Sequence, residues 1–236
     1  YLKQNQRMLR DWRAGALPPL PRFGWVDASS EGRELPAEEG VGLARRIGMD
    51  WALRLLAQES QTAAPILSLD ADALVAPNYL EQVYGLFDAS RAQAAVLPYA
   101  HPVEGRPRAV LPIVQYELYL RCYVLGLRTA RSPYAFHSMG CIFACRATAY
   151  AGVSGMPRRS AGEDFYFLQK LAKTYGIETI GETVVRPSGR ASDRVPFGTG
   201  PSVKALAGGD KRYTTTFDPQ SYLILREWLR MVSTRP

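Results

Sequence analysis

The sequence contains few of the residues that form covalent frameworks or soft-metal sites, with three cysteines and two histidines in 236 residues. Cys122, Cys141 and Cys145 do not form the even, spaced set of a disulfide framework, and no Cys or His cluster has zinc spacing. Cys141 and Cys145 are predicted to be core thiols. We therefore expect a chain that works in a reducing cytoplasm.

The sequence also has no long apolar run: none approaches the roughly 20 residues that a membrane-spanning helix requires. The longest run, at 110–127, contains Glu117 and Arg121 and predicts a helix. Core packing, an acceptor groove and peripheral contact with the inner face of the membrane stay open for it, with the basic amphipathic helix predicted at 221–232 as its companion. No signal peptide opens the chain, and because it begins with Tyr1 we expect a segment to precede it.

Acidic residues are fewer than basic ones, 22 against 29, which gives a formal charge of +7. Such an excess suits an anionic ligand, such as a nucleoside diphosphate, or an acidic membrane surface. The sequence has no stripe of aromatic and basic residues, no zinc finger and no helix-turn-helix pattern, so nucleic acid is not an expected partner. A basic surface without a specific ligand is the alternative interpretation.

Strand-like and helix-like segments alternate without internal repeats, which predicts an α/β fold with a mostly parallel sheet flanked by helices. The segment at 141–150 is typical of either a strand or the start of a helix. The segment at 187–212 is rich in Gly, Ser, Arg and Lys and predicts a long loop. Strands are expected at 23–29, 65–69, 92–100 and 177–187, and helices at 4–13, 40–57, 77–87, 161–176 and 221–232.

Two aspartates one residue apart, Asp70 and Asp72, follow the apolar run Pro65 to Leu69. Open α/β sheets bind ligands at the carboxyl ends of their strands. Alternate residues of extended backbone project to the same side, so both carboxylates are predicted to face one object. Like charges this close repel unless a positive charge lies between them, and carboxylate oxygens favour a hard divalent cation. We therefore predict a Mg or Mn site.

A second acidic pair, Glu163 and Asp164, opens the helix predicted at 161–176. Ser160 and Glu163 have capping-box spacing, so a structural role for Glu163 is an alternative to a functional one. Asp164 has no such explanation. Because the positive end of the helix dipole favours its ionised form, Asp164 is a candidate general base.

These residues belong to a larger pattern, in which VDAS (26–29), GVGLARRIGMDWAL (40–53), LDADALVAPNYL (69–80) and AGEDFYFLQKLAK (161–173) follow one another. The pattern resembles the family 2 glycosyltransferases. That resemblance implies a GT-A-type, Rossmann-like single domain over 1–186, whose first strand is absent from this chain. Residues 187–236 would then form a basic loop and an amphipathic helix that pack on the domain.

The resemblance also implies an inverting transfer of a sugar from a UDP- or GDP-sugar donor to a glycan, a lipid-linked acceptor or a small molecule. The expected metal ligands are Asp72 and Asp70, the expected base is Asp164, and Glu163 would lie on the acceptor side. The expected donor-binding residues are Asp27, Arg45 and Asp70.

Three departures from the family pattern limit what is carried over. The first strand, which lines the nucleotide pocket, is not in the chain; Arg46 stands where the family has asparagine; and no QxxRW motif of processive synthases occurs. The last departure favours transfer of one or a few sugars. A catalytically silent relative that binds a nucleotide or a glycan is the alternative function.

The basic loop holds Arg186, Arg190 and Arg194 together with Gly198 and Gly200. Mobile lids often close over bound substrates, so we hypothesise that Arg190 and Arg194 close over the donor diphosphate. A solvated basic loop is the competing interpretation. His137 and His101 are expected to be hydrogen-bonded structural residues.

Overall fold

The computed structural model describes residues 7, 8, 10, 11, 14, 15, 24–103, 107–193 and 195–233. In this part of the chain the fold is mixed α/β, which confirms the predicted class. The predicted helix at 4–13 lies mostly outside the described residues. None of the described helices has the length and apolarity to cross a membrane.

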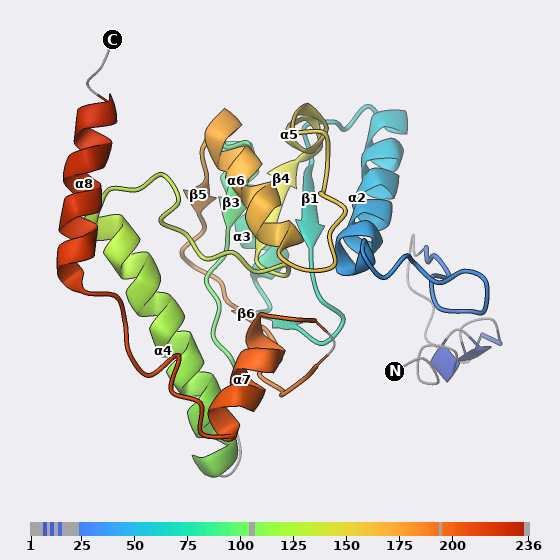
Figure 1. Ribbon diagram of the computed structural model, residues 1–236. Helices are drawn as coiled ribbons and strands as arrows, with labels where there is room; N and C mark the ends of the chain where they lie inside the picture. The colour runs from blue at the N-terminus through green and yellow to red at the C-terminus, as the bar shows by residue number, and fades with distance from the viewer. Residues whose placement is uncertain are drawn as a thin grey trace.

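One mixed sheet of four short strands forms the centre of the molecule (Figure 1). Its strands are β1 (Pro65–Ser68), β3 (Ala94–Val96), β4 (Phe143–Arg146) and β5 (Glu178–Thr179), in the order β1-β4-β3-β5. β4 pairs antiparallel with both β1 and β3, whereas β3 and β5 are parallel. β1, β3 and β5 therefore run one way and β4 runs the other.

The prediction of a mostly parallel sheet is wrong at the level of strand pairing, because β4 is inserted between β1 and β3. An apolar run reveals burial but not which neighbour a strand will pair with. The predicted strand at 23–29 does not form among its described residues. Gly24 instead packs on the indole of Trp51, which a Cβ at Gly24 would approach to 2.5 Å.

Helices cover both faces of the sheet. α2 (Gly40–Gln58), α5 (Ala147–Gly152) and α6 (Glu163–Tyr175) pack on the face that carries Phe143 and Cys145. α3 (Tyr79–Ala89) packs on the opposite face, to which Ala144 belongs. Since alternate strand residues point to opposite faces, one strand supplies both cores.

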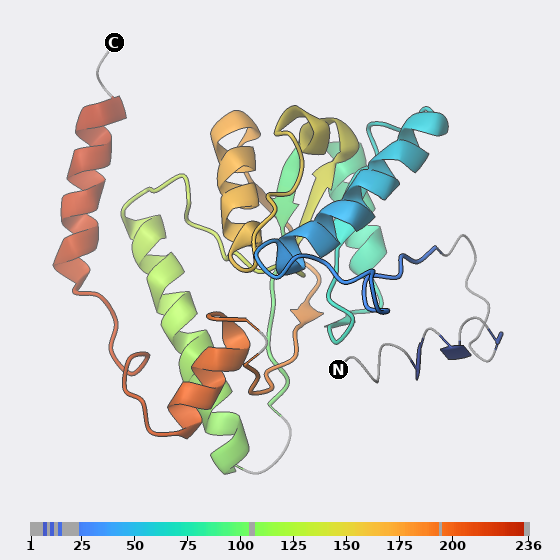
Figure 2. The same ribbon diagram turned by 45° about the vertical axis from the view of Figure 1, so that its right-hand side comes forward.

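A second group of helices lies beside this body: α4 (Pro107–Thr129), α7 (Thr199–Ala207) and α8 (Pro219–Ser233) (Figure 2). α4 and α7 share a small core formed by Ile113, Tyr116, Val203 and Leu206. α7 lies within the segment predicted as a loop, so that prediction is wrong for residues 199–207. The sequence favoured a loop here because glycines, which are poor helix formers, occur at 198, 200, 208 and 209.

A two-stranded antiparallel sheet of β2 (Leu74–Val75) and β6 (Val185–Arg186) connects the aspartate segment to the basic loop. β2 begins two residues after Asp72, and Leu74 pairs with Arg186. In an antiparallel pair the residues before one strand lie near the residues after the other. The segment after Arg186 is therefore held next to Asp72.

Candidate functional site

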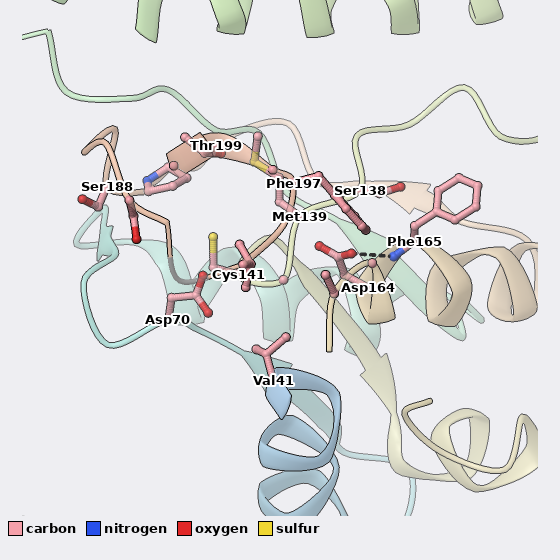
Figure 3. Close-up of a pocket in the computed structure, with 18 of the residues that line it drawn as sticks. Val41, Asp70, Ser138, Met139, Cys141, Asp164, Phe165, Ser188, Phe197 and Thr199 are labelled. Atoms are coloured by element: carbon pink, nitrogen blue, oxygen red, sulfur yellow. Dashed lines mark hydrogen bonds between the residues drawn. The ribbon is translucent and has the colours of Figure 1, made fainter. Parts of the chain in front are cut away.

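A cavity of about 540 Å³ opens where β1 ends (Figure 3). Ser68 at the end of β1 pairs with Phe143 at the start of β4, so the residues after β1 and those before β4 meet at one edge of the sheet. Residues 138–141, the first turn of α6 and the segment 187–200 complete the walls. Four of the five predicted acidic residues line it: Asp70, Asp72, Glu163 and Asp164.

Arg45 from α2 connects three of these walls through its guanidinium group, and its side chain is 12% exposed. Its Nη2 donates to Asp70 Oδ1 at 2.5 Å, and its Nε donates to Glu163 Oε1 at 2.9 Å. Its Nη1 donates to Ser68 Oγ and to the carbonyl of Gly140, both at 2.8 Å. Because a guanidinium is planar with several fixed donors, this single side chain sets the relative positions of its partners.

Gly140 is required by this arrangement, since a Cβ there would overlap Nη2 of Arg45. Burial acts to lower the pKa of Arg45, but the carboxylates of Asp70 and Glu163 outweigh burial and raise it. Arg45 is therefore permanently charged. Its guanidinium group is then a fixed positive charge between Asp70 and Glu163.

Each of the two aspartates pairs with a different arginine in this structure. Asp70 pairs with Arg45, and Asp72 pairs with Arg190, whose Nη2 lies 2.8 Å from Asp72 Oδ2. Arg190 comes from the segment that β6 holds beside Asp72. The sequence did not predict this ion pair of Arg190, and Arg194 lies outside the described residues.

Asp164 lies across the cavity from Asp70, and the two carboxylates turn toward the space between them (Figure 3). Its Oδ1 accepts a hydrogen bond of 2.7 Å from the backbone N–H of Phe165. Burial raises the pKa of Asp164 to about 6, and the charge of Glu163 adds to this shift. A carboxylate with such a pKa is a better proton acceptor near neutral pH than an ordinary aspartate.

Glu163 is not part of a capping box. α6 begins at Glu163 itself, its N-cap is Gly162 in the left-handed conformation with φ of 71°, and no side chain caps it. The Glu163 carboxylate is 5% exposed and accepts from Arg45 instead. The sequence spacing suggested a local partner, but the charged donor comes from a distant helix.

Asp27 lies outside the cavity-lining set. Its carboxylate accepts hydrogen bonds from the backbone N–H groups of Ser29 and Ser30 and from the Ser30 hydroxyl. The Ser30 hydroxyl is the main cause that lowers the pKa of Asp27 below its ordinary value. These contacts form a turn within its own loop.

Several lining residues were not predicted from the sequence. Tyr116 and Leu120 of α4, Tyr213 after α7, and Phe197 contribute apolar surface. Phe197 packs on Gly162, where a Cβ would lie 3.3 Å from its ring. Only their positions in the fold identify them, because a single aromatic residue in a sequence is as typical of a hydrophobic core as of a binding cavity.

Cys141 also lines the cavity and is buried, and burial raises its pKa to about 12. Cys145 is likewise buried, so both predictions of core thiols are confirmed. His137 contacts the ring of Tyr99 edge-on at a centroid distance of 4.9 Å and does not line this cavity.

Comparisons of the chain with protein-family models, with curated proteins and with solved structures find no match. Any function assigned to this chain therefore rests on its residues and their geometry.

Among the described residues, no group of three or more His, Cys, Asp or Glu side chains could hold a metal ion by itself. Asp70 and Asp72 nonetheless present a donor set of the kind Mg²⁺ accepts, since that ion is usually bound by one or two carboxylates with waters and substrate phosphates. The second oxygen of Asp70 and the partly exposed carboxylate of Asp72 fit this role. Arg190 would have to leave Asp72 for an ion to bind there.

Proposed function

We propose that this chain is an inverting glycosyltransferase that moves a sugar from a nucleoside diphosphate donor to an acceptor hydroxyl. The observation that carries the proposal is that Asp164, a carboxylate with a raised pKa, faces the cavity that also contains Asp70 and Asp72. The mixed α/β sheet with acidic residues at the end of β1 is compatible with a GT-A-type domain of family 2. A cytoplasmic location fits the three free cysteines.

In the proposed reaction Asp164 accepts the proton of the acceptor hydroxyl as the acceptor oxygen forms a bond to the anomeric carbon of the sugar. The bond from that carbon to the diphosphate oxygen breaks on the opposite side, and its electron pair leaves with the diphosphate. A divalent ion, Mn or Mg, held by Asp72 and Asp70 would act as a Lewis acid toward this leaving group.

Arg190 is suited to a second role at the same place. An ion at Asp72 would compete with Arg190 for that carboxylate, and the guanidinium group would then pair with the donor diphosphate, to which arginine binds well because of its planar fork of donors. Arg45 remains in place and holds Asp70 and Glu163 in their positions. Glu163 then keeps the local potential negative, which adds to the basicity of Asp164.

The second candidate is a silent relative that binds a nucleotide or a glycan without turnover. It is favoured by the ion pairs of both aspartates, because carboxylates already neutralised by Arg45 and Arg190 do not require a metal. The two candidates differ in one measurable property, which is release of nucleoside diphosphate.

The test is to incubate the chain with Mn²⁺ and a panel of UDP- and GDP-sugars and to measure released nucleoside diphosphate, with and without candidate acceptors. We expect release, and a decrease of about 10² to 10⁴ in its rate in Asp164→Asn, since a positioned base contributes that much. Asp72→Ala should lower the rate as strongly.

Asp88→Asn, on the exposed part of α3, is the matched control and should behave as the unsubstituted chain. Donor binding without release on any donor and acceptor would favour the silent relative. Equal rates in Asp164→Asn and Asp88→Asn would exclude Asp164 as the base.

A further inference from the structure

Helix α4 presents two different faces. One face packs inward with Ile113 and Tyr116, which belong to the core shared with α7. The other face carries an apolar stripe with exposed fractions between 42% and 64%, at spacings of three, four and seven residues that place its members on one side of a helix: Leu111, Val114, Leu118 and Leu125. The described part of the chain covers none of these four side chains fully.

The first part of helix α8 lies beside the C-terminal end of α4, and the rest of α8 extends past it (Figures 1 and 2). None of the residues of α8 is buried. Its Tyr222 contacts α4 so closely that a Cβ at Gly126 would overlap the tyrosine ring. Four apolar residues of α8 are between 52% and 69% exposed and share another face: Ile224, Trp228, Met231 and Val232. The α4–α8 surface is defined by these four residues and the four of the α4 stripe.

Arginines border this surface. Arg121 and Arg128 follow Leu118 and Leu125 by three residues, which places each arginine beside a leucine of the stripe. Arg128 has no ion pair within the described residues, while Arg121 pairs with Glu117. On α8, Arg226 and Arg230 lie on the polar face, and both form an ion pair with Glu227.

A second cavity, of about 320 Å³, opens beside the stripe. Its walls include Arg121, Arg128, His137 and Tyr99, together with Leu125 of the stripe itself. Burial and the two arginines lower the pKa of His137 to about 4, so the ring is neutral near pH 7 and its N–H is available as a donor. The cavity therefore combines two cationic groups with adjoining apolar surface.

We propose that the α4–α8 surface docks on an anionic phospholipid bilayer, with headgroup phosphates at Arg121 and Arg128 and with Trp228 at the level of the headgroups. An amphipathic helix with arginines on its polar face and tryptophan on its apolar face is typical of an interfacial helix. Because the described helices do not cross a membrane, the contact is with one leaflet.

The charge of the surface favours lipid over a second copy of the chain. A symmetric dimer places the same patch against itself, which would bring the arginines of both copies into one interface. An anionic bilayer instead neutralises them, and the net charge of +7 adds long-range attraction to such a membrane. Membrane docking of this kind does not depend on the glycosyltransferase reaction.

The experiment is flotation of the chain with vesicles of phosphatidylcholine alone and of phosphatidylcholine with phosphatidylglycerol, at low and high salt. We expect binding to the anionic vesicles at low salt, at least about tenfold weaker binding to the neutral ones, and a loss of binding when salt screens the charges. The tryptophan emission should shift to the blue with anionic vesicles, and Trp228→Phe should remove that shift.

Two variants locate the contact. The double variant Leu118→Ser, Ile224→Ser should bind anionic vesicles at least about tenfold more weakly, because it removes apolar side chains that would enter the membrane interface. Arg128→Gln should weaken binding to anionic but not to neutral vesicles. Leu80→Ser, at a position 58% exposed on α3, is the control and should bind as the unsubstituted chain. All of these positions are exposed, so the variants should keep their fold, as circular dichroism checks.

Three results would overturn the proposal. The first is a chain that does not float with either vesicle, and the second is equal binding by the Leu118→Ser, Ile224→Ser variant and by Leu80→Ser. The third is a concentration-dependent dimer, measured by sedimentation without lipid, that the same double variant abolishes. That result would assign the α4–α8 surface to a second copy.

Discussion

Burial of the Asp164 carboxyl group lowers the stability of the fold at neutral pH, but it also makes the carboxylate a better proton acceptor. Its pKa is about 6 in the folded chain, against an ordinary value near 3.8, because burial disfavours the charge. The folded state therefore binds the proton more tightly than the unfolded state. The resulting stabilisation is complete below pH 3.8, decreases as pH rises to 6, and is absent above that.

We predict that Asp164→Asn increases the free energy of unfolding at pH 7.5 by about 1 to 3 kcal/mol, since it removes a buried charge without changing the shape of the side chain. At pH 3.5, where the carboxyl is already protonated, the increase should vanish. Urea denaturation at the two pH values measures this. An equal effect at both would show that the charge of Asp164 is not the cause.

Among the residues of the site, loss of Arg45 should destabilise the fold most, because its side chain is only 12% exposed and donates hydrogen bonds to four acceptors. We predict that Arg45→Met lowers the free energy of unfolding by about 3 to 5 kcal/mol, since Glu163 becomes a buried charge without its partner. The double variant with Glu163→Leu should recover part of that loss. Urea denaturation of the two single variants and of the double variant tests this.

Arg46→Met is the matched control for Arg45→Met. Arg46 donates to the carbonyls of Ser154 and Met156 and is more exposed than Arg45, so its loss should be smaller. A loss below about 1 kcal/mol in Arg45→Met would contradict the central role of this guanidinium.

At the scale of elements, α4 is anchored to the chain after β3 by a charged cluster. Glu117 accepts from the backbone N–H of His101 at 2.8 Å and from Arg121 Nη2 at 2.6 Å, and its Oε2 lies 2.7 Å from His101 Nδ1. Arg121 also donates to the carbonyl of Tyr99. Burial acts to raise the pKa of Glu117, but these hydrogen bonds, that of His101 first, lower it to about 2.

This lowered pKa means that Glu117 stabilises the fold at neutral pH, and that the contribution is lost as pH falls from about 4.5 to about 2. We predict that Glu117→Gln lowers the free energy of unfolding by about 2 to 3 kcal/mol at pH 7 and by less than half of that at pH 3. Chemical denaturation at both pH values gives the comparison. The exposed Glu182→Gln should show no such difference.

At the scale of the whole molecule, the segment 187–198 reaches across the cavity. It pairs with Asp72 through Arg190 at one side and packs on Gly162 through Phe197 at the other. These contacts involve the two walls that carry the predicted metal ligand and the predicted base. This arrangement is compatible with the proposed lid, which would loosen to admit the proposed donor.

We predict that Arg190→Ala weakens the affinity for UDP or GDP in the presence of Mn²⁺ by about tenfold, because a charge-assisted contact to the diphosphate is lost. Calorimetric titration measures the affinity, and removal of Mn²⁺ with EDTA should weaken binding further. Lys204→Ala, which removes the ion pair with Asp193 outside the cavity, is the control. Unchanged affinity in Arg190→Ala would contradict the lid.

Local patterns in the sequence were enough to predict several helices and strands of this structure. The periodicity at 40–57 corresponds to α2, the apolar run before Asp70 to β1, and the segment at 161–176 to α6. Asp70, Asp72, Glu163 and Asp164 were also selected from local context, and the structure brings them to one cavity.

The predictions that failed depend on distant partners. The position of β4 between β1 and β3 and the packing of α7 on α4 are decided by contacts between separate segments. The resemblance of 160–163 to a capping box failed for the same reason, since Arg45 is 118 positions from the glutamate it bonds.

The sequence by itself determined the amphipathic helices such as α2 and α6, and where acidic side chains follow a strand or open a helix, because hydrophobic periodicity and charge are local properties. Only the tertiary structure decided that Arg45 neutralises Asp70, that Arg190 covers Asp72 and that burial raises the pKa of Asp164. Those properties depend on distances and on exclusion of water, and both arise only when segments far apart in the chain pack together.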